Sequence, residues 1–135
     1  MKCELINFKS FGDERGQLVA LENNKEIPFE IKRIYYIFGN VLNLRRGFHA
    51  HKRLKQVLIC VNGSCTIHVD DGNETNEILL DNPTKGLLID STIWREMYNF
   101  SKDAVLLVLA SEKYSSDDYL RDYDEFLKYI GGKND

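Results

Sequence analysis

The sequence lacks the features that mark nucleic-acid-binding and disulfide-stabilised proteins. No run of Lys and Arg is longer than two residues, and 18 basic residues stand against 21 acidic ones, a net charge of −3. Nucleic-acid binding needs a concentrated positive surface, so we exclude it as the main task. Only three cysteines are present (Cys3, Cys60 and Cys65), without zinc-ribbon or CxxC spacing, which favours reduced thiols over a disulfide framework.

Long apolar runs are also missing. No stretch approaches the roughly 20 apolar residues that span a bilayer. The first residues, Met1 to Glu4, lack the apolar core of a signal peptide, so we expect a cytoplasmic protein. A chain of 135 residues, 43% of them hydrophobic, can bury one core, and residues 1–135 are expected to form a single domain.

What the sequence does contain is a series of short β-branched and aromatic segments separated by turn residues. This pattern is typical of an all-β fold. The pairs Asn62-Gly63 and Asp71-Gly72 suit positive backbone φ angles and predict hairpins between antiparallel strands. The predicted strands are Cys3 to Phe8, Leu18 to Leu21, Ile31 to Phe38, Gly47 to His51, Gln56 to Val61, Ser64 to Val69, Glu77 to Leu80, Gly86 to Ile89, Arg95 to Asn99 and Ala104 to Ala110.

The last strand and the segment after it have distinctive patterns. Ala104 to Ala110 does not alternate with polar residues, so a second layer or a partner subunit should bury both its faces. This implies a sandwich or small barrel and, together with exposed sheet edges, predicts a dimer. Asp117 to Ile130 carries acids in its first turn and apolar residues at helical spacing before Gly131-Gly132, which predicts an amphipathic helix.

The densest chemical signal is the segment Arg45-Arg46-Gly47-Phe48-His49-Ala50-His51. In a strand, His49 and His51 project from the same face. Two adjacent imidazoles can bind a metal ion, or one can remove a proton while the other orients or relays it. Two histidines without a chemical role are the alternative, and the pattern alone leaves that choice open.

The spacing H-x-H-x4-Q-x6-G from His49 to Gly63 resembles the first motif of the cupin family, with Gln56 where metal-binding cupins have Glu. In such cupins a histidine from a later strand completes the metal site. The matching segment here, Gly86 to Asn99, contains none, and His68 lies just past a predicted turn. Two imidazoles and a neutral amide are a poor ligand set for zinc, iron or manganese, so we predict a metal-free site.

Seven further segments follow one another along the chain, namely Ile31 to Phe38, Arg46 to His51, Gln56 to Cys60, Asn62 to Ser64, Trp94 to Met97, Leu107 to Ser111 and Asp118 to Tyr123. In their order and spacing they resemble a narrower family, the dTDP-4-keto-6-deoxyglucose 3,4-ketoisomerases of bacterial deoxyamino-sugar pathways. The likeness covers nearly the whole chain, and Asp13 to Gly16 is also similar to the D-x-R-G segment of dTDP-sugar 3,5-epimerases. The likeness to the ketoisomerases implies the cupin fold, a double-stranded β-helix or jelly-roll barrel, with a short C-terminal helix.

The implied reaction moves the carbonyl of dTDP-4-keto-6-deoxyglucose from C4 to C3, and because it needs no redox chemistry we expect no cofactor. The C4 ketone acidifies the hydrogen on C3, so a base can remove it to give an enediolate before a proton returns to C4. Imidazole suits this task, and His49 and His51 fit as base and proton shuttle. Tyr35 is the candidate donor to the enediolate oxygen, or else a core tyrosine.

Guanidinium groups are the expected partners for the two phosphates of a nucleoside diphosphate. Trp94 can stack on the thymine or the hexose, or belong to the core, while Arg95 and Glu96 are expected beside the sugar. Positions 15 and 95 would border C4, and two arginines there leave the product's configuration, galacto or gluco, open. The arginines within family-like motifs, expected at the phosphates and sugar, are Arg15, Arg33 and Arg46.

Two other classes of protein stay open. A metal-dependent cupin oxygenase or isomerase would place His49, His51, Gln56 and His68 on one metal ion. A non-catalytic cupin would bind the nucleotide sugar and leave it unchanged. The expected partners are a dTDP-linked sugar and a second copy of the chain in a homodimer, with no nucleic acid and no membrane.

Overall fold

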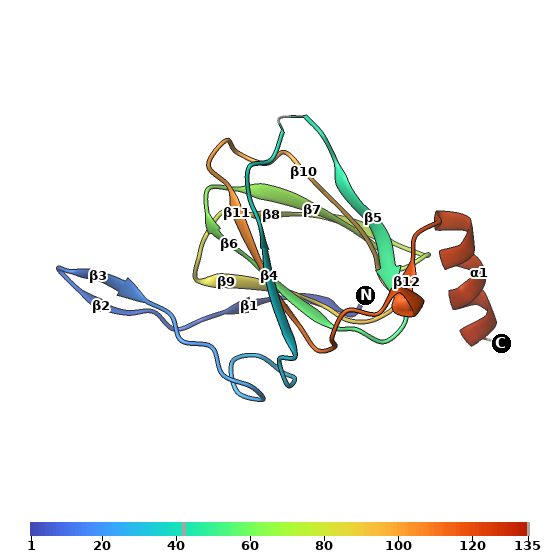
Figure 1. The fold of residues 1–135 in the computed structure, drawn as a ribbon, viewed down its shortest axis with the longest axis horizontal. Coiled ribbons are helices and arrows are strands. Elements are labelled where there is room, and N and C mark those ends of the chain that lie inside the picture. The colour runs from blue at the N-terminus through green and yellow to red at the C-terminus, as the bar shows by residue number, and fades with distance from the viewer. Residues whose placement is uncertain (42, 135) are drawn as a thin grey trace.

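Figure 1 shows the fold of the protein in a computed structural model, which describes residues 1–41 and 43–134. Short strands dominate, and the predicted all-β class with a short C-terminal helix is confirmed. The strands are β1 (Cys3–Asn7), β2 (Phe11–Asp13), β3 (Gly16–Leu18), β4 (Arg33–Ile37), β5 (Arg46–His51), β6 (Gln56–Asn62), β7 (Cys65–Asp70), β8 (Thr75–Leu80), β9 (Lys85–Ile89), β10 (Trp94–Tyr98), β11 (Val105–Ala110) and β12 (Tyr119–Leu120). The helices are the 3₁₀ helix η1 (Ser116–Asp118) and α1 (Tyr123–Asn134).

Two five-stranded sheets form the body of the fold. Their strand orders are β1-β9-β6-β11-β4 and β12-β5-β10-β7-β8, so neighbouring strands come from distant parts of the chain. Alternate residues of each strand face the space between the sheets. Leu58, Ile67, Met97, Leu106 and Val108 belong to the apolar cluster that fills this space. Removing such side chains from water is the main contribution that holds the two sheets together.

The two predicted glycine turns differ in what they connect. Asp71-Gly72 closes the hairpin between β7 and β8, with Gly72 at φ 91°. Gly63 also has a positive φ of 70°. However, β6 lies between β9 and β11 in one sheet, and β7 belongs to the other. The predicted hairpin at Asn62-Gly63 is therefore wrong, because this turn carries the chain from β6 in one sheet to β7 in the other.

The strand β11 is buried on both faces, as its non-alternating sequence predicts. Leu106 and Val108 belong to the cluster between the sheets, while Leu109 belongs to a second cluster on the outer face of the same sheet. The chain between β3 and β4 covers that outer face with the buried side chains of Ile27 and Phe29. The covering layer on this face thus comes from the chain itself.

The C-terminal helix α1 begins at Tyr123 rather than at the predicted Asp117. The residues before it form η1 and the two-residue strand β12, in which Tyr119 pairs with His51. The free edge of β5 offers backbone hydrogen-bonding groups, which explains why these residues leave the helix. Phe126 of α1 packs with Trp94, so the helix lies against one end of the second sheet (Figure 1).

Strands β2 and β3 form a separate hairpin, here called the arm, which projects from the body of the protein (Figure 1). Phe11 and Leu18 face each other across it and are 52% and 59% exposed. Arg15 lies in the turn at its tip. Exposed apolar side chains on a projecting hairpin indicate a surface that another chain can cover.

Within the described residues, no helix is long and apolar enough to span a membrane.

Candidate active site

A cavity of about 380 Å³ lies between the two sheets. Strand β4 of one sheet and strands β5, β10 and β12 of the other contribute to its wall. A mixture of apolar surface with a few convergent polar groups is typical of a small-molecule site. The lining residues are Arg33, Tyr35, Ile37, Arg46, Gly47, His49, Met97, Tyr119 and Arg121. The structure therefore brings four of the predicted site residues to one cavity.

A β-bulge in β5 sets the direction of two of these side chains. The pairing between β5 and β10 shifts register where His49 lies opposite Arg95, and Gly47 and Phe48 have φ angles of 98° and 56°. In a regular strand Arg46 and His49 would point to opposite faces. The bulge brings both to the cavity, as bulges beside functional sites commonly do. A Cβ atom on Gly47 would lie 3.1 Å from the backbone oxygen of Arg95.

His49 presents a neutral imidazole to the cavity. In the part of the chain that the structure describes, its buried Nε2 atom has no hydrogen-bond partner, while the ring donates a hydrogen bond to the backbone of Gly47. Burial, followed by the nearby charge of Arg95, lowers the pKa of His49 to about 4. At neutral pH the ring therefore carries no net charge and can accept a proton.

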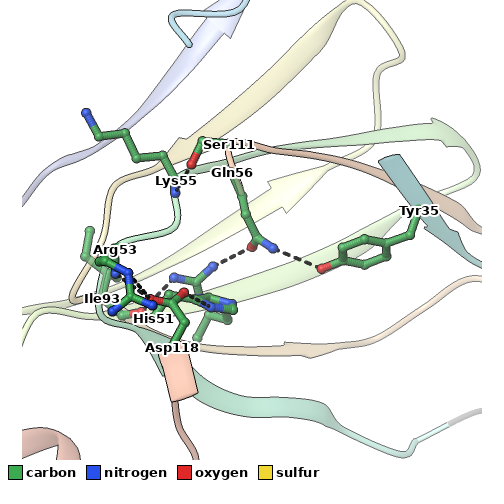
Figure 2. Close-up of polar contacts among 9 residues, drawn as sticks. Tyr35, His51, Arg53, Lys55, Gln56, Ile93, Ser111 and Asp118 are labelled. Carbon is green, nitrogen blue, oxygen red and sulfur yellow. Dashed lines mark hydrogen bonds and ion pairs between the residues drawn. The ribbon is translucent and has the colours of Figure 1, made fainter. Parts of the chain in front are cut away.

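His51 lies beside His49, with the ring centroids 4.9 Å apart and the planes 85° to each other. It is fully buried, and its Nδ1 is 3.1 Å from the Asp118 carboxylate (Figure 2). A carboxylate can only accept, so Nδ1 carries the hydrogen and Nε2 holds a free lone pair. Within residues 1–41 and 43–134, that Nε2 has no hydrogen-bond partner. Burial, and then Arg95, hold the pKa of His51 well below its usual range.

A chain of three polar side chains runs from the core to the cavity. Arg95 is fully buried and donates from one terminal nitrogen to Gln56 Oε1 at 2.6 Å and from the other to the carbonyl of Ile93 at 2.9 Å. Gln56 Nε2 in turn donates to the hydroxyl of Tyr35 at 3.0 Å (Figure 2). Burial lowers the pKa of Arg95 to about 10, so the guanidinium stays charged at neutral pH.

Three arginines give the cavity a positive rim. The guanidinium of Arg33 lies 5.0 Å from the ring centroid of Tyr35, and that of Arg121 lies 4.1 Å from the ring of Tyr119. Stacking on a ring holds a guanidinium in place while leaving its N–H groups available. With Arg46, these residues offer a cluster of donors suited to a diphosphate.

Three predicted site residues lie away from this cavity. Arg15 forms an ion pair with Asp13 at the tip of the arm, and its side chain is 85% exposed. Trp94 is buried against the helix and donates from Nε1 to Glu96 at 2.9 Å, while Glu96 pairs with Arg45. Neighbouring strand residues point to opposite faces, so β10 cannot present Trp94, Arg95 and Glu96 to one site.

Sequence reasoning missed three residues near the imidazoles, namely Asp118, Tyr119 and Arg121. The sequence pattern placed all three residues on the predicted helix and assigned Tyr119 to its apolar face. The structure places Tyr119 on β12, with its ring centroid 4.5 Å from that of His51. The signal that could have found them was the segment Asp118 to Tyr123, which is one of the family-like segments.

The residues at this site do not fit a metal ion. Gln56 Oε1 already accepts a hydrogen bond from Arg95, and a buried guanidinium repels a second cation. In the part of the chain that the structure describes, no group of three or more His, Cys, Asp or Glu side chains is placed to hold a metal.

Comparison with known proteins relates nearly the whole chain to sugar-nucleotide isomerases. Residues 1–131 match the profile of the family described as FdtA, WxcM-like, C-terminal. The chain is 54% identical over 134 residues to the TDP-4-oxo-6-deoxy-alpha-D-glucose-3,4-oxoisomerase of Aneurinibacillus thermoaerophilus, covering 99% of this chain and 96% of that protein.

Solved structures of 3,4-ketoisomerases superpose closely. One from Helicobacter canadensis has a TM-score of 0.95 at 53% identity, with 97% of this chain and 98% of that chain covered. A mutant of the enzyme from Thermoanaerobacterium thermosaccharolyticum, in complex with TDP-4-keto-6-deoxyglucose, has a TM-score of 0.94 at 44% identity, with 97% and 95% covered. This likeness confirms the predicted cupin fold.

Proposed function

The chain belongs to the FdtA family of WxcM-like, C-terminal domains, and on this basis we propose that it is a dTDP-sugar 3,4-ketoisomerase. The proposed substrate is dTDP-4-keto-6-deoxyglucose, whose carbonyl moves from C4 to C3. The observation that carries the proposal is the neutral imidazole of His49, whose Nε2 has no hydrogen-bond partner among the described residues, in a cavity that Tyr35 and three arginines also line. The 54% identity to a 3,4-oxoisomerase supports it independently.

His49 is the proposed base. Its Nε2 takes the C3 proton, the C3–H electron pair forms the C3–C4 double bond, and the C4 carbonyl becomes the oxyanion of an enediolate. Return of a proton to C4, with loss of the O3 proton and protonation of O4, gives the 3-keto sugar. His51, held by Asp118 at 3.1 Å, is the proposed proton shuttle behind His49. A positioned base of this kind contributes about 10²- to 10⁴-fold to the rate.

Tyr35 is the proposed hydrogen-bond donor to the enediolate oxygen. It lines the cavity together with His49, and it comes from the opposite sheet, so the sugar can lie between the two side chains. A donor fixed before the reaction stabilises the developing charge without reorganisation. Burial raises the pKa of Tyr35, so its hydroxyl keeps its proton at neutral pH.

The diphosphate is proposed to bind Arg33, Arg46 and Arg121 on the rim of the cavity. Arg95 is buried behind the wall, and its proposed part is electrostatic, acting on the imidazoles and on Tyr35. The proposal leaves out Trp94 and Glu96 because their side chains bond to each other on the outer face of β10.

We further propose a homodimer, in which the arm of one subunit reaches its partner and places Arg15 near a sugar site. The exposed apolar side chains of Phe11 and Leu18 on the arm support this arrangement. The protein is proposed to act in the cytoplasm, as a single domain over residues 1–135 and with no cofactor. The three free thiols fit a reducing compartment.

Incubation of the protein with dTDP-4-keto-6-deoxyglucose, followed by ¹³C NMR of the sugar ring, tests the function. The proposal expects the C4 carbonyl signal to disappear as a C3 carbonyl signal grows, with the same rate in the presence of EDTA. Binding of the nucleotide sugar without conversion would favour a sugar-binding cupin. Loss of the conversion in EDTA would favour a metal-dependent enzyme.

A further inference from the structure

Gln56 is a fully buried side chain whose two ends contact different members of the site. Its Oε1 accepts a hydrogen bond from Arg95 at 2.6 Å, and its Nε2 donates to Tyr35 at 3.0 Å. Burial of an amide is unfavourable unless its polar atoms are paired. The function proposed above gives Gln56 no part in the chemistry, and the present inference rests on that function.

The orientation of this amide is fixed by Arg95. A guanidinium has donors and no acceptor, so the atom of Gln56 that faces it must be the oxygen. Arg95 itself cannot turn away, because its other terminal nitrogen donates to the carbonyl of Ile93 at 2.9 Å. The –NH₂ group of Gln56 is thereby left facing the hydroxyl of Tyr35, as Figure 2 shows.

This arrangement decides where the hydroxyl hydrogen of Tyr35 points. The –NH₂ group can only donate, so the Tyr35 oxygen accepts, and its own hydrogen must point elsewhere. Within residues 1–41 and 43–134 the Tyr35 hydroxyl has no other hydrogen-bond partner, and Tyr35 lines the cavity. We propose that Gln56 is a positioning residue that keeps the Tyr35 O–H directed at the substrate oxygen on which negative charge develops.

The substitution Gln56→Glu tests the direction of the hydrogen bond at nearly constant shape. A carboxylate keeps the contact with Arg95 as an ion pair but presents an acceptor to Tyr35, so the tyrosine donates to residue 56 and not to the substrate. We expect kcat to fall about 10²- to 10³-fold, as for loss of an oxyanion donor. The dissociation constant for dTDP should stay within about threefold, because Gln56 is not among the residues that line the cavity.

A second variant separates positioning from structural support. Gln56→Met has a similar length and no polar N or O atoms, so it leaves Arg95 without one acceptor and Tyr35 free to rotate. If Gln56 only supported the fold, activity would follow thermal stability, and Met would be worse than Glu. Positioning predicts the reverse, with Glu the more stable variant and the less active one. Activity in the order wild type, Glu, Met would overturn the proposal.

Controls and an independent readout complete the test. The control variant Asn76→Asp makes the same amide-to-acid change at an exposed position on β8 and should leave kcat unchanged. A chelator in all assays removes any metal ion that the carboxylate of Gln56→Glu recruits together with the two histidines. Tyr35→Phe should reduce kcat as much as Gln56→Glu, and the double variant no further. The Tyr35 pKa, followed by NMR with ¹³C-labelled tyrosine, should rise in Gln56→Glu, because in the wild type the bond from Gln56 lowers it.

The spectroscopic result distinguishes two kinds of failure. An unchanged Tyr35 pKa in Gln56→Glu would overturn the inference about orientation, whatever the enzyme does. A raised Tyr35 pKa in a protein whose wild type does not convert dTDP-4-keto-6-deoxyglucose would leave the orientation in place and overturn the proposed function.

Discussion

At the scale of single residues, an imidazole can remove a proton near neutral pH only while the ring is neutral, with one nitrogen unprotonated. The interior of this protein provides that condition in two ways. Burial disfavours the charged form of His49 and His51, and the cation of Arg95 disfavours it further. Arg95 remains charged because Gln56 and the Ile93 carbonyl accept its hydrogen bonds. The single buried cation of Arg95 thus acts electrostatically on both the proposed base, His49, and the tyrosine opposite it, Tyr35.

Replacement of either histidine should separate catalysis from nucleotide binding. In His49→Asn and His51→Asn we expect turnover to fall by about 10²- to 10⁴-fold, because a proton acceptor or relay is lost. The affinity for free dTDP should be nearly unchanged, since the proposed phosphate ligands are Arg33, Arg46 and Arg121. Kinetics and calorimetric titration with dTDP measure the two effects, and a parallel loss of affinity and turnover would count against the catalytic assignment.

The same burial should make the protein less stable in acid. An unfolded histidine binds its proton near pH 6.5, whereas folded His49 binds one only near pH 4. As the pH falls between these values, the unfolded chain takes up a proton that the folded chain does not, so the free energy of unfolding decreases. The slope reaches up to about 1.4 kcal/mol per pH unit for each buried histidine.

Denaturant unfolding at pH 7, 6 and 5 measures this slope. The His49→Asn variant is the control, because it removes one titrating group and should show a shallower decrease. A free energy of unfolding that stays constant between pH 7 and pH 5 in the wild type would contradict the buried, neutral state of the two rings.

Site residues could be predicted from the sequence where the spacing within a motif identifies them. They could not be predicted where the packing of a strand decides which face its side chains occupy. His49 and Arg46 lie in one short motif, and both reach the cavity. Arg95 and Glu96 are expected beside the sugar because their strand faces the histidine strand in cupins, and Trp94 is expected either to stack on the ligand or to belong to the core. The choice between the faces of β10 depends on its register with β5 and β7, which no local pattern contains.

At the scale of elements, two irregularities build the site. The bulge in β5 brings Arg46 and His49 to the same cavity, and β12 adds Tyr119 beside the imidazoles. Sequence patterns predicted most of the strands, because β-branched runs bounded by turn residues have few alternatives. They did not predict β12, since acids and apolar residues at helical spacing gave the same signal as the helix that follows.

The substitution Gly47→Ala should damage the bulge. Its φ of 98° is unfavourable for any residue with a Cβ, and that Cβ would lie 3.1 Å from the Arg95 oxygen. We expect a loss of about 1–3 kcal/mol in stability, with a fall in both turnover and dTDP affinity because His49 and Arg46 shift together. Thermal unfolding and steady-state kinetics measure these effects.

Gly131→Ala in α1 is the matched control, because a Cβ there meets no atom of the described residues within 4 Å. It should stabilise the helix by up to about 1 kcal/mol and leave activity unchanged. Wild-type stability and kinetics in Gly47→Ala would mean that the bulge does not set the site.

At the scale of the whole molecule, the apolar residues of one sheet edge remain uncovered. Strand β4 lies at the end of its sheet, and Ile34, Tyr36 and Phe38 on and after it are 59%, 63% and 67% exposed. An exposed apolar edge of this kind favours pairing with another chain. The sequence predicted a dimer from exposed sheet edges and from the doubly apolar β11. The chain covers β11 itself, so the exposed edge at β4 and the arm are what support the proposed dimer.

Sedimentation at micromolar concentration measures this association. We expect the wild type to sediment as a dimer and Tyr36→Lys, which places a charge in the exposed edge, to shift it towards the monomer. Lys85→Arg, an exposed change that keeps its charge on β9, should remain dimeric. A wild type that is monomeric at this concentration would contradict the proposed interface and the placement of Arg15 across it.

The most direct test of the account is the fate of one hydrogen atom. Incubation with dTDP-4-keto-6-deoxyglucose in D₂O, followed by NMR of the ring positions, should yield the 3-keto sugar with deuterium on C4, because His49 and His51 exchange their proton with the solvent during the enediolate stage. The His49→Asn variant should show neither the new carbonyl nor the deuterium at a comparable rate. Unlabelled sugar with its carbonyl still on C4, or a 3-keto product whose C4 hydrogen is entirely protium, would contradict proton transfer by the imidazole pair.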